Sequence, residues 1–315
     1  MNQPAHLLLV LPCYNEEDVL QKTNQTLQAY FVELLKMGLI GSESKICFVD
    51  DGSRDRTWAL VETICKENTN AIGLKLSRNF GHQSALLAGL EHHAGQFDCY
   101  ITIDADLQDD IRAIENMLLK NREGARIVYG VRDDRSTDSW FKRQTAESFY
   151  GLMQNMGVPV VFNHADFRLI DDRVLREFQN YRETNMFLRG MFPLIGFRSD
   201  KVFYKRLKRE AGQTKYPLSK MMLFAWNGIT SFSTTPMRMV LYFGMFNFFI
   251  SLLILGYAVS AFFFKETVPG WTSTLLPLTF FSGSNMVAVG LIGEYVGKIY
   301  EEVKARPRFI IEKTV

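Results

Sequence analysis

The chain has 315 residues, of which 47% are hydrophobic and 22% are charged, and its formal net charge at pH 7 is +2. This composition is ordinary for a globular protein, and the near-neutral charge gives no reason to expect a nucleic-acid partner. The length allows one large domain or two smaller ones.

Short apolar segments alternate with longer segments of helical periodicity through the first 130 residues. The strand segments are residues 7–12, 45–50, 71–77, 99–104 and 126–130, and the helical segments are residues 16–36, 56–68, 83–94 and 111–123. Strands that alternate with helices in this way predict an α/β fold, in which helices cover both faces of a mostly parallel sheet.

A polar cluster follows each predicted strand. In chain order the clusters read "CYNEE", "DDGSRD", "RNFGHQ", "DADLQDD" and "VRDDR". Ligands of such sheets bind beyond the carboxyl ends of the strands, so these clusters are expected to form one site. The chain has neither a G-x-G-x-x-G segment after the first strand nor a Walker A lysine loop, which disfavours the usual dinucleotide and nucleoside-triphosphate sites.

The fourth cluster has the composition of a metal site. Asp104 and Asp106 lie on alternate positions of an extended segment, so their carboxylates point to the same side. Together with the amide oxygen of Gln108 they provide oxygen donors of the kind that Mg²⁺ or Mn²⁺ prefers.

The last third of the chain has a different character. Residues 239–264 and 271–293 contain no charged side chain, and each run is long enough to cross a hydrocarbon core as a helix. Basic residues flank the pair on both sides, which places both termini in the cytosol. Gly293 and Gly297 have helix-packing spacing, which permits a homo-oligomer.

These features predict four parts: a cytosolic catalytic domain at 1–210, interfacial juxtamembrane helices at 211–237, a two-helix transmembrane domain at 238–298 and a cytosolic tail at 299–315. The aromatic and methionine residues before the first span favour helices that lie on the membrane surface. The N-terminus lacks the basic region of a signal peptide.

Several motifs carry a resemblance to a known family. "LPCYNEE", "VDDGSRDRT", "LSRNFGHQSALLAGL" and "IDADLQDD" resemble the family 2 inverting glycosyltransferases, whose fold is the Rossmann-like GT-A fold. "ADFRLIDDRV", "ITSFSTTPMRM" and "GLIGEYVGKIYEEVKARPRF" resemble more narrowly the polyprenyl-phosphate glycosyltransferases, which include dolichol-phosphate mannose synthases and bactoprenol glucosyltransferases. The resemblance implies an enzyme that uses a nucleotide sugar, usually a UDP-sugar.

The resemblance also implies roles for individual residues. Those that would bind the nucleotide sugar are Pro12, Tyr14, Glu16, Val49, Asp51, Asp104 and Arg209. Those that would bind the acceptor phosphate are Arg132, Arg143 and Arg206. Asp106 and Gln108 would hold the divalent metal on the diphosphate, Asp166 would be the catalytic base, and Asp104 would face the reacting sugar. His82 lies in the third polar cluster and could contact the donor.

The sequence therefore predicts a hexosyltransferase at the cytosolic face of the bacterial inner membrane. The best single expectation is inverting transfer of glucose from UDP-glucose to undecaprenyl phosphate, for modification of a cell-surface glycan such as lipopolysaccharide. Two alternatives remain. A processive polysaccharide synthase is disfavoured because the chain has no Q-x-x-R-W segment and only two predicted spans. A non-catalytic membrane scaffold is disfavoured by the acidic and basic clusters at the expected site.

Overall fold

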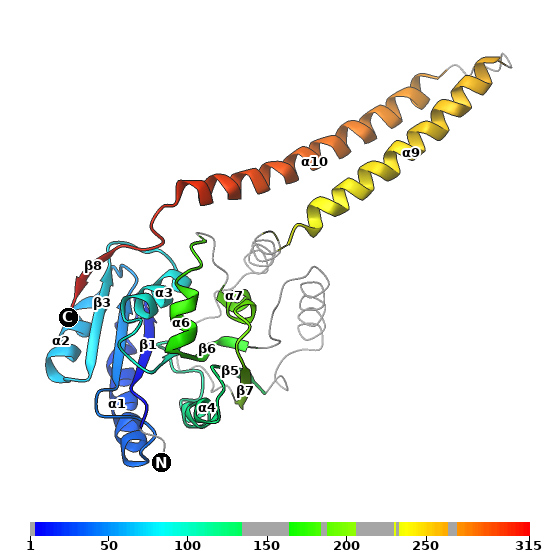
Figure 1. The fold of residues 1–315 in the computed structure, drawn as a ribbon. Coiled ribbons are helices and arrows are strands. Elements are labelled where there is room, and N and C mark those ends of the chain that lie inside the picture. The colour runs from blue at the N-terminus through cyan, green and yellow to red at the C-terminus, as the bar shows by residue number, and fades with distance from the viewer. Residues whose placement is uncertain (1–3, 134–163, 184–187, 206–229, 231–232, 264–269) are drawn as a thin grey trace.

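The computed structural model describes residues 4–133, 164–183, 188–205, 230, 233–263 and 270–315. An eight-stranded mixed sheet forms the centre of the first domain, with the strand order β7-β5-β6-β4-β1-β2-β3-β8 (Figure 1). The strands are β1 Leu7–Cys13, β2 Lys45–Asp50, β3 Ala71–Leu76, β4 Cys99–Thr102, β5 Ile127–Arg132, β6 His164–Asp171, β7 Ser199–Tyr204 and β8 Ile311–Thr314.

The first four strands are parallel to one another. β6 runs antiparallel to both β4 and β5, so β5 points in the same direction as β4. The five strands expected from the sequence are therefore present, and their carboxyl ends lie at one edge of the sheet. The predicted α/β class, with a mostly parallel sheet, is confirmed. β6, β7 and β8 add to the predicted set.

Helices cover both faces of the sheet. The helices of the sheet domain are α1 Leu20–Lys36, α2 Thr57–Glu67, α3 His82–His92, α4 Ala113–Arg122, α6 Asp172–Phe178 and α7 Leu188–Leu194. Residues of α1, α2 and α4 pack on one face, and residues of α3, α6 and α7 pack on the other. β1 lies between these two layers and is buried along its whole length, which explains its continuous apolar sequence.

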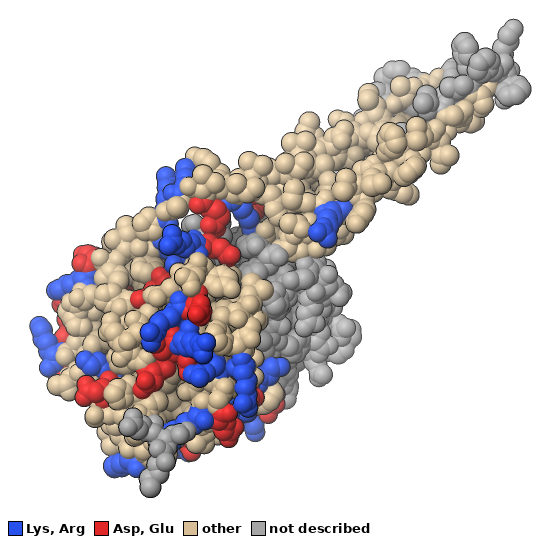
Figure 2. Space-filling view, in the orientation of Figure 1, with Lys and Arg blue, Asp and Glu red and all other residues tan. Residues whose placement is uncertain are grey.

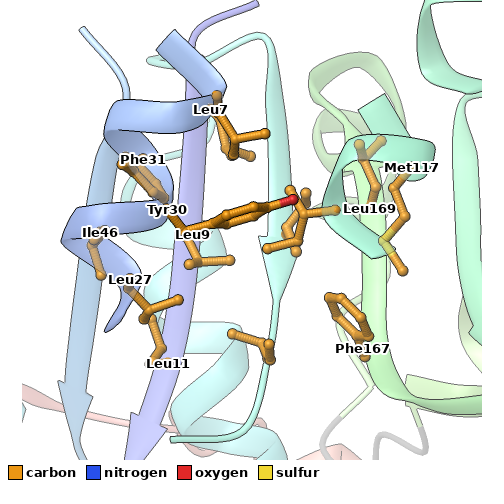
Figure 3. Packing of buried hydrophobic residues seen from close by; sticks show 14 of the residues in the cluster. Leu7, Leu9, Leu11, Leu27, Tyr30, Phe31, Ile46, Met117, Phe167 and Leu169 are labelled. Carbon is orange, nitrogen blue, oxygen red and sulfur yellow. The ribbon is translucent and has the colours of Figure 1, made fainter. Parts of the chain in front are cut away.

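The packing of α1 shows how the sequence pattern specifies this layer. Leu27, Phe31 and Leu34 are fully or almost fully buried and recur at helical spacing, so one stripe of the helix faces the sheet. Figure 3 shows Leu27 and Phe31 beside Leu9 and Leu11 of β1. The alternate side chains of β1 pack on the opposite face, as expected for a strand with a period of two.

Helix α1 begins at Leu20, four residues later than the sequence pattern predicts. The preceding loop is joined to the segment after β2 by several hydrogen bonds. The backbone N–H groups of Asn15, Glu16 and Glu17 donate to the side chains of Ser53, Thr57 and Asp55, respectively, at 2.9–3.2 Å. These bonds hold residues 15–17 at the edge where the ligand is expected.

Two long helices, α9 Thr235–Phe263 and α10 Trp271–Lys304, lie side by side and project away from the sheet domain (Figure 1). Charged side chains gather on the sheet domain and at the base of the helix pair, whereas the outer part of the pair is almost uncharged (Figure 2). Within the described residues, no helix combines the length and apolar character needed to cross a membrane. The two predicted spans and the four-part division of the chain stay predictions, and most of segment 211–237 lies outside the described residues.

The segment after α10 returns to the sheet. β8 pairs antiparallel with β3, and Val315 and Gly73 exchange two backbone hydrogen bonds of 2.8 and 2.9 Å. A largely buried ion pair joins Arg308 to Glu91 on α3 at 2.9 Å. The segment 299–315 thus contributes an edge strand, and it ties the base of the long helix pair to the sheet domain.

Replacing Arg308 with alanine is expected to lower the free energy of unfolding by about 1–3 kcal/mol. The change leaves the carboxylate of Glu91 in a largely buried position without its charged partner. Chemical denaturation of the two proteins measures the difference. The matched control is Lys313→Ala, which removes the exposed ion pair with Glu62 from the same tail and should leave the midpoint unchanged. Equal effects of the two changes would contradict the importance of the buried pair.

Candidate active site

Asp51 joins the loops that follow β2 and β3. Its Oδ1 accepts the N–H of Phe80 at 2.7 Å, and its Oδ2 accepts the N–H of Gly81 at 2.9 Å. Burial raises the pKa of Asp51, although these two hydrogen bonds act in the opposite direction. Asp51 therefore braces the edge of the site. Its expected contact with the nucleotide base stays a prediction.

Gly52 allows the same two loops to meet. Its φ of +65° lies in the left-handed region, and a Cβ on this residue would lie 2.4 Å from the backbone carbonyl carbon of Arg78. Glycine alone satisfies both the dihedral angle and the close approach. In the "DDGSRD" cluster, Gly52 thus allows the two loops to approach each other, and Asp51 joins them by hydrogen bonds.

The acidic segment after β4 forms a tight turn at the same edge. Leu107 has a φ of 45°, and Asp106 Oδ1 accepts the N–H of Gln108 at 3.3 Å. Burial raises the pKa of Asp104; the nearby His82 lowers it, whereas the carboxylates of Asp166, Asp109 and Asp106 raise it further. The turn therefore concentrates negative charge at one point of the edge.

The donor set of this turn suits a hard divalent cation. Among the described residues, no group of three or more His, Cys, Asp or Glu side chains could hold a metal ion. Asp106 and Gln108 supply two oxygen donors, which fits a Mg²⁺ or Mn²⁺ site that takes its remaining ligands from substrate phosphates and water. The carboxylates of Asp106, Asp109 and Asp166 lie near Asp104, and their negative charge also favours a bound cation. The metal role of the two residues stays a prediction.

Arg132 lies at the end of β5, beside the acidic turn. Its Nη2 and Nε lie 3.2 and 3.3 Å from Oδ1 of the buried Asp109, and its Nε donates to the hydroxyl of Tyr204 at 3.4 Å. Burial lowers the pKa of Arg132, but the nearby Asp109, Tyr204 and Asp104 together outweigh burial, and the net shift is upward. The guanidinium is therefore positively charged and held at the edge where an anionic acceptor is expected.

Asp166 lies next to Asp104 because of the register of β6 on β4. Thr102 pairs with Arg168 in this antiparallel ladder, and Thr102 Oγ1 also donates to the backbone carbonyl of Asp166. His82, the first residue of α3, bridges the two carboxylates: its Nε2 lies 3.5 Å from Asp104 Oδ1 and 3.5 Å from Asp166 Oδ2. Three segments that are distant in the sequence, namely the turn after β4, the start of α3 and strand β6, therefore meet at this point.

Two arginines bind the carboxylate of Asp166. Arg168 Nη2 lies 2.6 Å from Oδ1, and Arg189 places Nη2 3.0 Å from Oδ2 and Nε 3.3 Å from Oδ1. Burial alone would raise the pKa of Asp166, but Arg189, His82 and Arg168 together hold it well below its ordinary value. A carboxylate with such a low pKa is a weak base, so these surroundings disfavour the catalytic-base role expected from the sequence.

The other predicted site residues divide into two groups. Pro12 and Val49 are buried and lie opposite each other in the register of β1 and β2. Tyr14 and Glu16 follow in the loop after β1, and the side chain of Tyr14 is exposed. Arg143, Arg206 and Arg209 lie outside the described residues. Asp51, Asp104, Asp106, Gln108, Arg132 and Asp166 all lie at the same edge of the sheet.

Two site residues were not predicted, namely Arg168 and Arg189. Arg168 follows Asp166 by two residues on a strand, so the alternation of side chains could have indicated that the two share a face. No pattern in the sequence links Arg189 to Asp166, because the two residues are 23 positions apart and lie on different elements.

The model of "Glycosyl transferase family 2" matches residues 8–179. The uncharacterized glycosyltransferase YkoT of Bacillus subtilis is 49% identical over 314 residues, covering 99% of this chain and 92% of the relative. The prophage SfII-derived bactoprenol glucosyl transferase of Shigella flexneri is 38% identical over 308 residues, covering 97% of each chain.

A solved structure is also similar, at a lower level. The glucosyl-3-phosphoglycerate synthase of Mycobacterium tuberculosis, determined with Mn²⁺, UDP-glucose and phosphoglyceric acid, aligns with a TM-score of 0.45 and 16% identity, covering 72% of this chain and 78% of that one. At this level of similarity its ligands are not transferred to the present chain.

The family resemblance inferred from the motifs is confirmed by these matches. Because the family model covers more than half of the chain, and the two relatives match almost all of it, the protein belongs to glycosyl transferase family 2 and is a glycosyltransferase.

Proposed function

We propose that the protein transfers a single glucose from UDP-glucose to undecaprenyl phosphate, with inversion, at the cytosolic face of the bacterial inner membrane. One observation carries the proposal: a bactoprenol glucosyl transferase is 38% identical over 97% of both chains. The similarity thus extends beyond the sheet domain to the long helix pair and the tail. The product would supply sugar for modification of a cell-surface glycan.

The donor would bind along the carboxyl ends of β2, β1 and β4. The β2 and β3 loops, braced by Asp51, would form the nucleotide end of the pocket, and Asp104 would face the sugar. Asp106 and Gln108 would hold Mg²⁺ or Mn²⁺ at the diphosphate. The metal would neutralise the negative charge that increases on the nucleoside diphosphate as it leaves.

The acceptor would approach from the β5 side, where Arg132 is held. A phosphate monoester has a second pKa near 6, so it is largely ionised at pH 7 and is already a nucleophile. One of its oxygens would form a bond to the anomeric carbon as the bond from that carbon to the diphosphate breaks, on the opposite side of the sugar. This reaction needs no strong base, which agrees with the low pKa of Asp166.

The α9–α10 pair would keep the site at the membrane, where the lipid acceptor lies. Many large apolar side chains of α9 are exposed, among them Leu241, Phe243, Phe246, Phe249 and Leu253. An exposed apolar surface of this extent in a protein with a lipid substrate favours contact with a bilayer. The basic residues near the base of the pair would face anionic lipid headgroups.

The test is an assay of membranes that contain the full chain, with undecaprenyl phosphate and a panel of radiolabelled UDP-sugars. The expected product is extracted into chloroform and carries one glucose, with the anomeric configuration opposite to that of the donor. A long polymer would support a processive synthase instead. An absence of product with every UDP-sugar would contradict the proposal.

A further inference from the structure

His82 lies between two carboxylates at the ligand edge. Its Nε2 is 3.5 Å from Asp104 Oδ1 and 3.5 Å from Asp166 Oδ2. Burial and the nearby Arg189 lower the pKa of His82, but its contact with Asp166 and the charges of both carboxylates outweigh them, and the net shift is upward. The raised pKa favours the imidazolium, so one cation separates two carboxylates that would otherwise repel each other.

The position of His82 in its helix is unfavourable for a cation. His82 is the first residue of α3, and Gly81 is its N-cap. The N-terminal end of a helix carries partial positive charge, which attracts anions and repels cations. A protonated histidine here therefore weakens the helix unless nearby anions offset the repulsion, as Asp104 and Asp166 do. A charge that conflicts with its own helix but suits the neighbouring segments is expected at a functional site.

The charge of His82 matters more to Asp104 than to Asp166. Asp166 also pairs with Arg168 and Arg189, at 2.6 and 3.0 Å. Burial raises the pKa of Asp104, His82 lowers it, and three neighbouring carboxylates raise it further. Without a cation at position 82, the carboxylate of Asp104 would therefore take up a proton more readily or turn away from Asp166.

The backbone before His82 is fixed from the nucleotide end of the expected site. The N–H groups of Phe80 and Gly81 donate to the carboxylate of Asp51 at 2.7 and 2.9 Å. The His82 side chain extends from this braced point to Asp104. The two side chains are 44% and 40% exposed, so both are accessible to a ligand at this edge. A cation on a fixed backbone can hold the neighbouring carboxylate in one orientation.

We propose that His82 is a positioning residue of the transfer reaction, and that its imidazolium holds the carboxylate of Asp104 in the orientation that faces the donor sugar. This inference rests on the proposed function, which gives Asp104 that contact. The sequence allowed a direct contact between His82 and the donor, whereas here His82 acts through the carboxylate. A small displacement of a group beside the reacting sugar costs more in turnover than in acceptor binding, so the role is expected to appear in kcat.

The test uses the full chain in membranes and compares wild type with His82→Gln and His82→Lys. Glutamine keeps an N–H donor and removes the charge. His82→Gln is expected to lower kcat about 10- to 100-fold and to change KM for undecaprenyl phosphate less than about twofold. His82→Lys should recover most of the loss, because it keeps a cation beside Asp104. An unchanged kcat in His82→Gln, or equal losses in the two variants, would overturn the proposal.

A double variant tests whether His82 acts through Asp104. Asp104→Asn removes the charge that His82 would hold, so adding His82→Gln should lower kcat by less than about twofold beyond Asp104→Asn alone. Single-turnover measurements with excess enzyme give the rates of the slow variants. Two losses that multiply would show that His82 acts independently of Asp104, and they would overturn the proposal.

The matched control is His92→Gln. His92 is an exposed histidine at the other end of the same helix, so the same substitution should leave kcat and both KM values unchanged. A fall in kcat as large as that of His82→Gln would overturn the proposal. Chemical denaturation checks that each variant folds, and His82→Asn replaces His82→Gln in the comparison if the latter does not fold.

The outcomes separate this inference from the proposed function. A wild-type enzyme that transfers no sugar from any UDP-sugar to undecaprenyl phosphate refutes the proposed function. Normal wild-type transfer together with full turnover by His82→Gln refutes only the role of His82.

Discussion

Asp106→Ala is expected to retain less than about 1% of the wild-type turnover at saturating substrates. The carboxylate of Asp106 is one of the two oxygen donors proposed for the metal, and removal of a group that stabilises charge in the transition state typically costs a factor of about 100 or more. The measurement is kcat with Mg²⁺ and with Mn²⁺, together with the binding of Mn²⁺ to wild type and variant.

The matched control for this prediction is Asp110→Ala. Asp110 lies in the same acidic segment, but its Oδ1 accepts the backbone N–H of Arg112 at the start of α4. Its loss should leave the metal dependence of the reaction unchanged. Near-normal turnover by Asp106→Ala, or undiminished transfer by the wild type after exhaustive chelation, would contradict the metal assignment.

Asp166→Ala is expected to destabilise the protein by about 3–5 kcal/mol, which is the typical cost of removing one partner from a buried ion pair. The guanidinium of Arg168 is almost completely buried and would lose its carboxylate partner. Chemical denaturation of the full chain measures the change. The matched control is Asp200→Ala, since Asp200 forms a more exposed ion pair with Lys120 and such pairs contribute only about 0–1 kcal/mol. Similar losses for the two variants would contradict this account of the buried Asp166–Arg168 pair.

The pH dependence of the rate distinguishes two roles for Asp166. The residue could hold Arg168 and Arg189 in place, or it could act as a base. Because its pKa lies well below the ordinary value of 3.8, Asp166 is fully ionised from pH 6 to 8. A carboxylate with a lowered pKa stabilises the fold above its unfolded pKa, and this contribution is lost as the pH falls below 3.8 toward the folded pKa. Asp166→Asn should therefore lower the rate by the same factor at pH 6, 7 and 8. A loss that changes with pH across this range would favour the base.

The sequence predicted the part of the site that depends on local patterns. Apolar segments mark β1 to β5, and the polar residues directly after them reach the same edge because parallel strands share a direction. Asp104, Asp106 and Gln108 could be nominated because their spacing and residue types fit a known donor set. The start of α1 was misplaced because residues 15–17 belong to a loop, and this loop is held by contacts with the distant segment 53–57 that the local pattern does not show.

The rest of the fold and of the site depends on contacts between segments that are distant in the sequence. The insertion of β6 between β4 and β5 places Asp166 beside Asp104, and strand order cannot be read from periodicity. The addition of β8 to β3 joins residues more than 230 positions apart, as the Lys75–Glu312 contact shows. Arg189 reaches Asp166 only because α7 packs on the same face of the sheet as α3.

By itself, the sequence determined the α/β class, the ligand edge and the acidic turn, since strand propensity, side-chain alternation and donor chemistry act over a few residues. Only the tertiary structure decided the charge state of Asp166 and the position of Arg189. A pKa depends on every charge within a few ångströms, and here those charges come from β6, α3 and α7, which folding brings together.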